Sequence, residues 1–401
     1  MSAPGVVITG MGCVSASGNR TADLAANLRA GTSGVRIEGS DGADWDLGPV
    51  SADFEGRVKR LALRRLDDSM RRALHAALQA VDAAGLDVTE PTKDLGVVVA
   101  TGYAGTASSH AFIRTVWEHG PDGADPSLFP NTVPNGPAGQ LAIHLKARGP
   151  GTNFFEADTA GESALRYARR EILAGHADAV LVCGVDERPE AVVAVEELYR
   201  RARTRRAPAG LLRPFDAARS GTTMGQASAA VLLESAEAAR RRGAEPLAVL
   251  GPVELGAEAS PPGAWPRKPE TLARTALRAL EAAGAGGDIA FTNTCARGSR
   301  EYDAFEARAL ELVTDALGRG RPVCAPMGYT GSLSTSALFR LVVSVLGLRE
   351  GFVPATARLL EPDAALGVDV APEARPLEGN AVLQIGAGAG GTNAALVVSR
   401  P

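Results

Sequence analysis

The first residues that could do chemistry lie in the run FFEADTAGESA at positions 154–164. The run follows a Gly149-Pro150 turn and precedes LRYARREILAG, which has the apolar spacing of an amphipathic helix. Asp158 is therefore expected where an extended segment meets a helix N-terminus. Unpaired N–H groups and the helix dipole favour an anion or a thiolate there. Asp158 could be a helix cap or buried acid accepting N–H bonds, or an acid with a direct chemical role.

Cysteine and histidine are sparse, and their positions limit the chemistry further. The cysteines Cys13, Cys183, Cys295 and Cys324 show neither metal-ligand spacing nor a disulfide pattern, which favours reduced thiols, no metal site and a cytoplasmic protein. Cys13, Cys183 and Cys324 lie in or beside apolar runs and are expected in the core. The last of the five histidines is His176, so the C-terminal half of the chain has none.

Composition excludes several classes of function. The 401 residues are 45% hydrophobic and 22% charged, which is typical of a globular protein with a large core. The net charge of −4 offers no basic surface for nucleic acid. No apolar run is long enough to span a bilayer, and the opening MSAPGVVITGMG lacks the positive segment of a signal peptide.

The elements that must position these residues are short apolar runs alternating with helical patterns. Such runs favour strands of sheets that are covered on both faces. They fall in two series, which predicts a duplicated α/β architecture with halves at 1–242 and 243–401. The first series is 6–12, 95–102, 178–186 and 227–235; the second is 247–255, 288–295, 322–327, 380–388 and 393–400.

Two further patterns concern a helix and two loops. The helix predicted at 161–175 carries a core-facing stripe of Ala164, Leu165, Ala168 and Ile172. Segments 200–214 and 256–269 are rich in arginine or proline, which is typical of surface loops.

Three stretches together carry a family resemblance. VVITGMGCVSASG opens the chain, RPFDAARSGTTMGQASAAVLLES covers 213–235, and AGAGGTNAALVV closes it. In order and spacing they resemble the β-ketoacyl synthase family nearly from end to end. The resemblance implies a thiolase-like α/β fold with duplicated α-β-α-β-α layers, and it implies no cofactor.

The family's condensation chemistry uses a cysteine nucleophile, two histidines and usually a supporting lysine. The matching motifs here read EADTAG, CARGS and MGYTGS. By this resemblance Asp158 stands at the cysteine position, Cys295 and Ser332 at the histidine positions, and Met327 at the lysine position. Since no histidine follows His176, no shift of the alignment restores the set. We therefore expect no catalytic residues for condensation in this chain.

This pattern of losses resembles the chain-length factors, the ketosynthase β-subunits of type II polyketide synthases. Their motif usually reads like E-Q-A-G-G before a helix containing A-R-R; Asp158 here stands at the usual glutamine. The resemblance implies a heterodimer with an active ketosynthase α-subunit and an acyl carrier protein bearing the growing chain. The implied role is to shape the tunnel for a polyketide, polyene or fatty-acid-like product.

The resemblance also suggests which residues border that tunnel and the former active site. Helix residues within 102–117 would line the tunnel, residues within 129–143 would reach across the dimer interface, and a late loop would border the old site. Taken alone, Ile113, Val116 and Trp117 are more typical of a core. The implied residues are Thr106, Ser109 and Ile113; Thr132 and Val133; and Ala387, Gly388 and Ala389.

Two other classes of function stay open. The chain could be a ketosynthase-like enzyme repurposed for hydrolysis, dehydration or cyclisation, with Asp158 as base and Cys295 or a serine as the only available partner. Cys295 itself is either a displaced nucleophile without an evident activating base or a small pocket residue. The third class is a homodimeric scaffold that binds acyl carrier protein.

Overall fold

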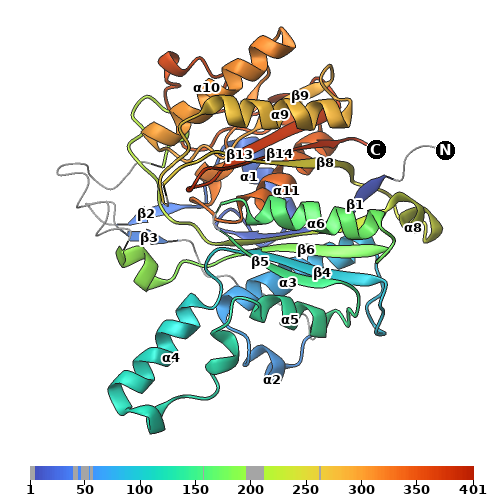
Figure 1. The fold of residues 1–401 in the computed structure, drawn as a ribbon, viewed down its shortest axis with the longest axis vertical. Coiled ribbons are helices and arrows are strands. Elements are labelled where there is room, and N and C mark those ends of the chain that lie inside the picture. The colour runs from blue at the N-terminus through green and yellow to red at the C-terminus, as the bar shows by residue number, and fades with distance from the viewer. Residues whose placement is uncertain are drawn as a thin grey trace.

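The architecture is one ten-stranded mixed sheet with helices packed on both of its faces (Figure 1). The computed structural model describes residues 5–38, 44–46, 54, 57–156, 158–195, 212–261 and 263–401. From edge to edge, the strands of the main sheet are β10 (Val323–Cys324), β9 (Ile289–Asn293), β13 (Ala381–Ala387), β14 (Thr392–Ser399), β8 (Ala248–Ala257), β1 (Val6–Ser15), β7 (Ala227–Ser235), β6 (Ala179–Asp186), β4 (Leu95–Thr101) and β5 (Gly151–Phe155).

The sheet consists of two five-stranded halves with the same pattern of strand pairing. In one half β4 is parallel to β5 and β6, and β7 runs antiparallel to β6 and β1. In the other half β9 is parallel to β10 and β13, and β14 runs antiparallel to β13 and β8. The halves join where β1 pairs with β8 over Val6–Ile8. A domain boundary at 242/243 stays a prediction.

Helices form three layers around these strands, which confirms the predicted α/β layering (Figure 1). The outer helices are α3 (Asp68–Ala84) and α5 (Gly136–His144) on one half, and α9 (Pro269–Ala283) and α10 (Arg300–Leu317) on the other. The helices between the halves are α6 (Ala160–Leu173) and α11 (Ser336–Glu350), with α1 (Thr21–Ala30) packed against α11. Shorter elements are α2 (Arg60–Leu63), α8 (Ala236–Arg241), and the small sheets β2 (Arg36–Glu38) with β3 (Asp44–Asp46) and β11 (Phe352–Val353) with β12 (Arg375–Pro376).

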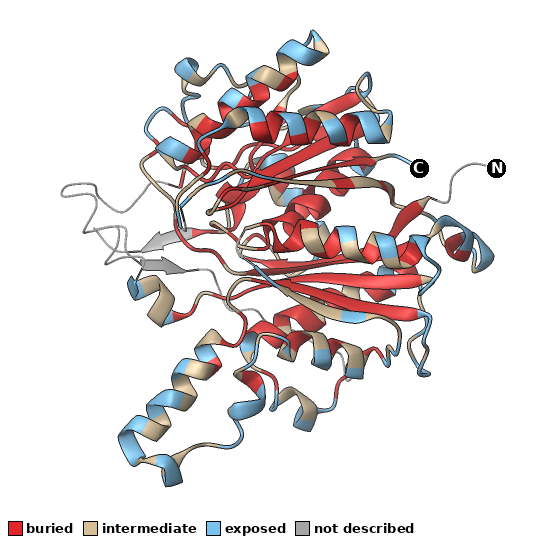
Figure 2. Ribbon diagram, viewed as in Figure 1, coloured by how far each residue is buried: buried red, intermediate tan, exposed pale blue. Residues whose placement is uncertain are grey.

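The central helices follow directly from their sequences. Helix α11 reads SALFRLVVSVLGLRE and is buried on every side from Ser336 to Leu348, as expected for a helix that is apolar all round (Figure 2). Its Arg340 pairs with Glu162 of α6 at 2.7 Å, so the buried charges are matched. The stripe predicted on α6 is confirmed, because all four of its residues are buried.

One predicted strand and two predicted loops can be compared with the structure. The strand predicted at 322–327 has only two residues in β10 before the chain turns into η3 (Pro326–Tyr329), because Pro326 lacks the N–H that a strand would use. The surface loop predicted at 256–269 is confirmed between the end of β8 and the start of α9, and its Trp265 packs against Tyr302, with ring centroids 4.8 Å apart. Most of the other predicted loop, 200–214, lies outside the described residues, which resume at Leu212.

Helix α4 (Thr106–His119) extends away from the body of the protein (Figure 1). Ser108 is its one buried residue, while Ile113 is 57% and Trp117 is 86% exposed, so the interpretation of these side chains as core was wrong. The N-terminus of α4 is held by the buried Glu187, whose Oε1 accepts N–H bonds from Thr106 (2.8 Å) and Ala107 (3.2 Å). Among the described residues, no helix is long and apolar enough to cross a membrane.

Candidate functional site

Four chain segments meet where strands of both halves end. The turn from β5 into α6 brings Asp158, and the segment from β9 into α10 brings Cys295 and Arg297. The segment between η3 and α11 brings Ser332, and the turn between β13 and β14 brings Ala387, Gly388 and Ala389. Because corresponding strands of the two halves direct these turns to one place, residues far apart in the sequence become neighbours.

Asp158 contacts two of these segments. Its Oδ1 forms an ion pair with Arg297 Nη1 at 3.0 Å, and its Oδ2 accepts the Ala389 N–H at 3.1 Å. A Cβ at position 388 would lie 2.8 Å from the Cβ of Asp158, so this close packing requires Gly388. Asp158 has φ 53°, a left-handed conformation that aspartate tolerates better than most residues.

The interpretation of Asp158 as the cap of α6 was wrong. The N-cap residue is Thr159, and it makes no side-chain cap bond. The carboxylate of Asp158 turns away from the helix N-terminus because Arg297 offers a stronger, charge-assisted partner.

Arg297 is the residue at the centre of the site, and sequence reasoning missed it. Its Nη2 donates to Cys295 Sγ at 2.9 Å and its Nη1 donates to Ser332 Oγ at 3.2 Å, in addition to the ion pair with Asp158. The side chain is only 3% exposed. One guanidinium thus contacts Asp158, Cys295 and Ser332, the three positions that the resemblance assigns to the family's cysteine and histidines.

Two aromatic rings and one acid hold Arg297 in place. The guanidinium carbon lies 4.4 Å from the ring centre of Tyr302 and 4.7 Å from that of Trp265, within cation–π range. Asp303 accepts backbone N–H bonds from Arg297 (3.0 Å) and Gly298 (3.1 Å), which fixes the loop. Burial opposes the charge on Arg297, but Cys295 and Asp158 raise the pKa of the guanidinium well above its usual value.

Beneath Arg297 lies a buried network of polar groups. The Tyr302 hydroxyl accepts the Ala387 N–H at 3.0 Å and lies 3.1 Å from Glu306 Oε1. Glu306 also accepts the N–H of Cys295 at 3.1 Å. Burial raises the pKa of Glu306 to about 7, so this acid exchanges its proton near neutral pH. The network links the loop that contains Ala387 to the segment that contains Cys295.

Of the remaining candidate residues, Met327 lies in the core, and the others lie on α4 or just after η2. Met327 is fully buried in a hydrophobic cluster that also contains Tyr329. Ser109 donates to the Thr132 carbonyl at 3.0 Å, so the base of α4 meets the segment after η2 (Phe129–Asn131). Ile113 and Val133 are exposed.

The cysteines are all buried. Cys13, Cys183 and Cys324 belong to the core, as predicted, and burial raises the pKa of the Cys13 thiol to about 12. Cys295 differs because, besides Arg297, its Sγ lies 3.3 Å from Ser336 Oγ. Among the described residues, no group of histidine, cysteine, aspartate or glutamate has the arrangement of a metal site.

A single signal in the sequence pointed to Arg297. The run TNTCARGS is made of small residues apart from this arginine, and it directly follows an apolar strand. A charge in such a place needs a buried partner. Nothing local identifies that partner as Asp158, which lies 139 residues away.

The fold and these motifs place the chain in the β-ketoacyl synthase family. The family described as "Beta-ketoacyl synthase, N-terminal domain" matches residues 3–239. A putative polyketide β-ketoacyl synthase 1 from Streptomyces halstedii is 30% identical, over 99% of this chain and 98% of that protein.

Two further comparisons extend this result. The 3-oxoacyl-[acyl-carrier-protein] synthase 2 of Coxiella burnetii is 27% identical, over 98% of both chains. The solved structure of the ishigamide ketosynthase/chain length factor superposes with a TM-score of 0.89 at 24% identity and covers 100% of both chains. The likeness to the last shows a shared fold.

Proposed function

We propose that this chain is the non-condensing partner of an active ketosynthase, a chain-length factor that shapes the space for a growing acyl or polyketide chain. The observation that carries the proposal is Arg297. It is buried, charged and bonded to Asp158, Cys295 and Ser332, the positions where condensation would need a thiolate and two imidazoles. A guanidinium can act neither as nucleophile nor as general base at neutral pH.

The same contacts weigh against a repurposed enzyme that uses Asp158 as base. Both oxygens of Asp158 are engaged, one by Arg297 and one by the Ala389 N–H. A general base must have an oxygen within reach of a substrate proton. Burial raises the pKa of Glu306 in this site to about 7, but Glu306 is fully buried and accepts from the Tyr302 hydroxyl.

The surface near β5 supports the proposed heterodimer. Strand β5 is an edge strand of the main sheet, and an edge strand with large apolar neighbours is suited to pairing with another chain. The exposed apolar side chains on β5, α5, α4 and the η2 segment are Phe155, Ile143, Ile113, Trp117, Phe129 and Val133. We expect an interface of the obligate type that includes this surface and buries more than about 2,000 Å² in total.

The names of the relatives agree with these partners. One similar structure is a ketosynthase/chain length factor, and one relative is a synthase of acyl-carrier-protein thioesters. We therefore propose a ketosynthase α-subunit and an acyl carrier protein as partners of this chain. A homodimeric scaffold would use the same apolar surface, and co-purification distinguishes the two.

The test measures acyl loading and assembly together. The chain is expressed alone and with an intact ketosynthase, each is incubated with acyl-loaded carrier protein, and intact mass is measured. We expect the acyl mass on the ketosynthase only, and we expect both subunits to elute as one complex. An acyl adduct on this chain would contradict the proposal.

The variant Asp158→Cys tests whether restoring a thiol at this position is enough for condensation. Asp158→Cys restores a thiol but leaves it beside Arg297, Cys295 and Ser332, with no histidine in the C-terminal half. We expect this variant to remain unable to condense malonyl units. Condensation by the variant alone would show that the missing histidines are not needed.

A further inference from the structure

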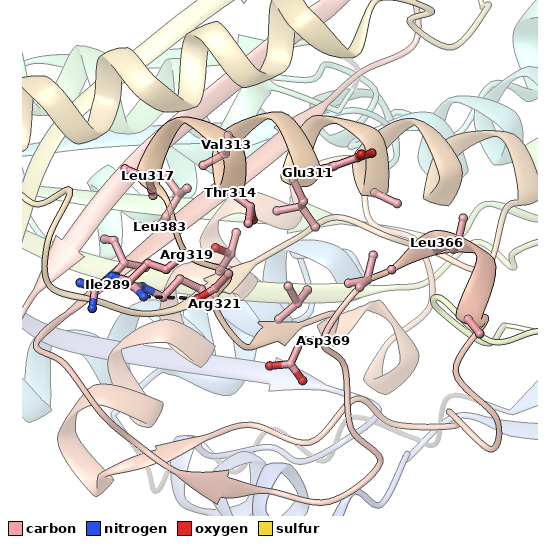
Figure 3. Close-up of a pocket in the computed structure, with 18 of the residues that line it drawn as sticks. Ile289, Glu311, Val313, Thr314, Leu317, Arg319, Arg321, Leu366, Asp369 and Leu383 are labelled. Atoms are coloured by element: carbon pink, nitrogen blue, oxygen red, sulfur yellow. Dashed lines mark hydrogen bonds between the residues drawn. The ribbon is translucent and has the colours of Figure 1, made fainter.

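A pocket lies in the C-terminal half, between α10, β9, β10 and the segment that contains η4 (Ala364–Leu366) (Figure 3). Its volume is about 380 Å³, near the lower end of the roughly 300–1,000 Å³ typical of small-molecule sites. None of its lining residues belongs to the Arg297 site. Its apolar wall includes Ile289, Leu310, Val313, Leu317, Leu366 and Leu383.

Two arginines form the charged end of this pocket (Figure 3). Arg321 Nε and Nη2 are buried and have no hydrogen-bond partner among the described residues. Its Nη1 reaches only the Gly320 carbonyl, at 3.3 Å. Arg319, which also lines the pocket, donates to the Gly287 carbonyl.

The positive charge of Arg321 is not fully balanced by the negative charge near it. Burial and the neighbouring Arg319 lower the pKa of Arg321, and Asp288 only partly offsets them. Buried N–H donors of an arginine that lack an acceptor are costly, and a bound anion would satisfy them.

The carboxylates around the pocket are already paired. Glu311 forms an ion pair with Arg308 one turn earlier on α10. Asp369 pairs with Arg375 at 2.6 Å, and Asp288 accepts from Asn380 Nδ2 at 3.0 Å. The acceptor for Arg321 can therefore come from a bound anion that displaces solvent.

We propose that this pocket binds a small carboxylic acid with an unbranched apolar tail. The carboxylate pairs with the guanidinium of Arg321, a planar fork that matches its two oxygens, and Arg319 adds positive charge. The tail lies along the leucine and valine side chains of α10 and Leu383 of β13, which removes apolar surface from water. This site is independent of the proposed role in chain-length control.

The test uses sodium octanoate as the probe with the full-length chain, in the complex in which it purifies. Binding is measured by calorimetry and by ligand-observed NMR. Acetate has the head group without the tail, and octylammonium has the tail with the opposite charge. We expect octanoate to bind more tightly than either. Equal binding of octylammonium, or no binding of octanoate at 10 mM (roughly the weakest affinity of interest), overturns the proposal.

Variants locate the binding. Arg321→Gln should weaken octanoate binding about tenfold or more, because it removes a charged fork of donors. Thr314→Phe fills the pocket from α10 and should also weaken binding without changing the charge. Arg29→Gln, in a half-exposed pair with Glu350 and outside the pocket lining, should leave binding within about twofold of wild type, since exposed pairs contribute little.

Two results decide whether octanoate enters another cavity instead. Ser109→Phe lies on the face proposed to line the acyl tunnel and should not affect octanoate binding at this pocket. If Ser109→Phe abolishes binding while Arg321→Gln and Thr314→Phe do not, the pocket is not the site. If Arg321→Gln fails to fold, Thr314→Phe alone decides.

Discussion

Arg297→Met should be among the most destabilising single substitutions in this chain. Methionine keeps much of the length and apolar contact of the arginine but removes its charge. Asp158, whose side chain is 12% exposed, then loses its counter-ion. Breaking a buried ion pair by removing one partner typically costs about 3–5 kcal/mol. Because Asp158 retains some solvent and the Ala389 N–H, we expect the lower end, about 3 kcal/mol.

The reverse change and the double substitution test whether the pair accounts for that cost. Asp158→Asn keeps the shape of the side chain and leaves Arg297 with Cys295 and Ser332 as partners, so we expect about 1–3 kcal/mol. In Asp158→Asn/Arg297→Met neither charge is stranded. The double variant should therefore be less destabilised than the sum of the single variants, by about 1–3 kcal/mol.

The assay is equilibrium unfolding in urea, followed by circular dichroism and tryptophan fluorescence at one protein concentration, since assembly shifts apparent stability. Arg308→Met is the matched control, because Arg308 is 54% exposed in its pair with Glu311. The control should change the free energy of unfolding by less than about 1 kcal/mol. If Arg297→Met costs no more than the control, or if the two single effects add, Arg297 does not hold the site together as argued.

Three further predictions concern the tunnel, the interface and pH. Thr106→Phe or Ser109→Phe should overpack the proposed tunnel wall at a cost of about 1–3 kcal/mol and so shorten the products of the reconstituted pair. Starter loading of the partner should stay intact. Unchanged product lengths by mass spectrometry would show that this face does not line the tunnel. Phe155 lies on edge strand β5 and is 55% exposed. Phe155→Asp should reduce co-purification with the ketosynthase and leave the fold, measured by circular dichroism, intact. Full recovery of the complex would place the interface elsewhere. Burial raises the pKa of Glu187 from 4.5 to about 7, so the folded protein binds this proton more tightly than the unfolded chain does. The stability that Glu187 contributes is thus present below about pH 4.5 and is lost as pH rises through about 7. Glu187→Gln should flatten the decline in the urea midpoint between pH 5 and pH 8, by an amount equivalent to at most about 3 kcal/mol. An unchanged slope would assign that pH dependence to other groups.

Local pattern in the sequence was sufficient for most of the scaffold. Apolar runs between helical patterns predicted nine strands of the main sheet, and the two series anticipated the repeated pairing pattern. This works because the period of burial along a strand or helix is a property of neighbouring residues. The pattern did not include β5 as a strand, since its half-exposed residues at the edge of the sheet lack the apolar run of the interior strands.

The absence of histidine after His176 is also a property of the sequence, because it holds in any fold. The partners of the residues that remain were decided by the tertiary structure. Asp158 and Arg297 are 139 positions apart, and only the meeting of β5 and β9 turns makes them an ion pair instead of leaving Asp158 to cap α6. Likewise, Trp117 is a large apolar residue of the kind found in cores, yet it is exposed on α4 because none of the described residues covers it. Hydrophobic periodicity is short-ranged, whereas pairing of buried charges and coverage of apolar faces depend on contacts between distant segments.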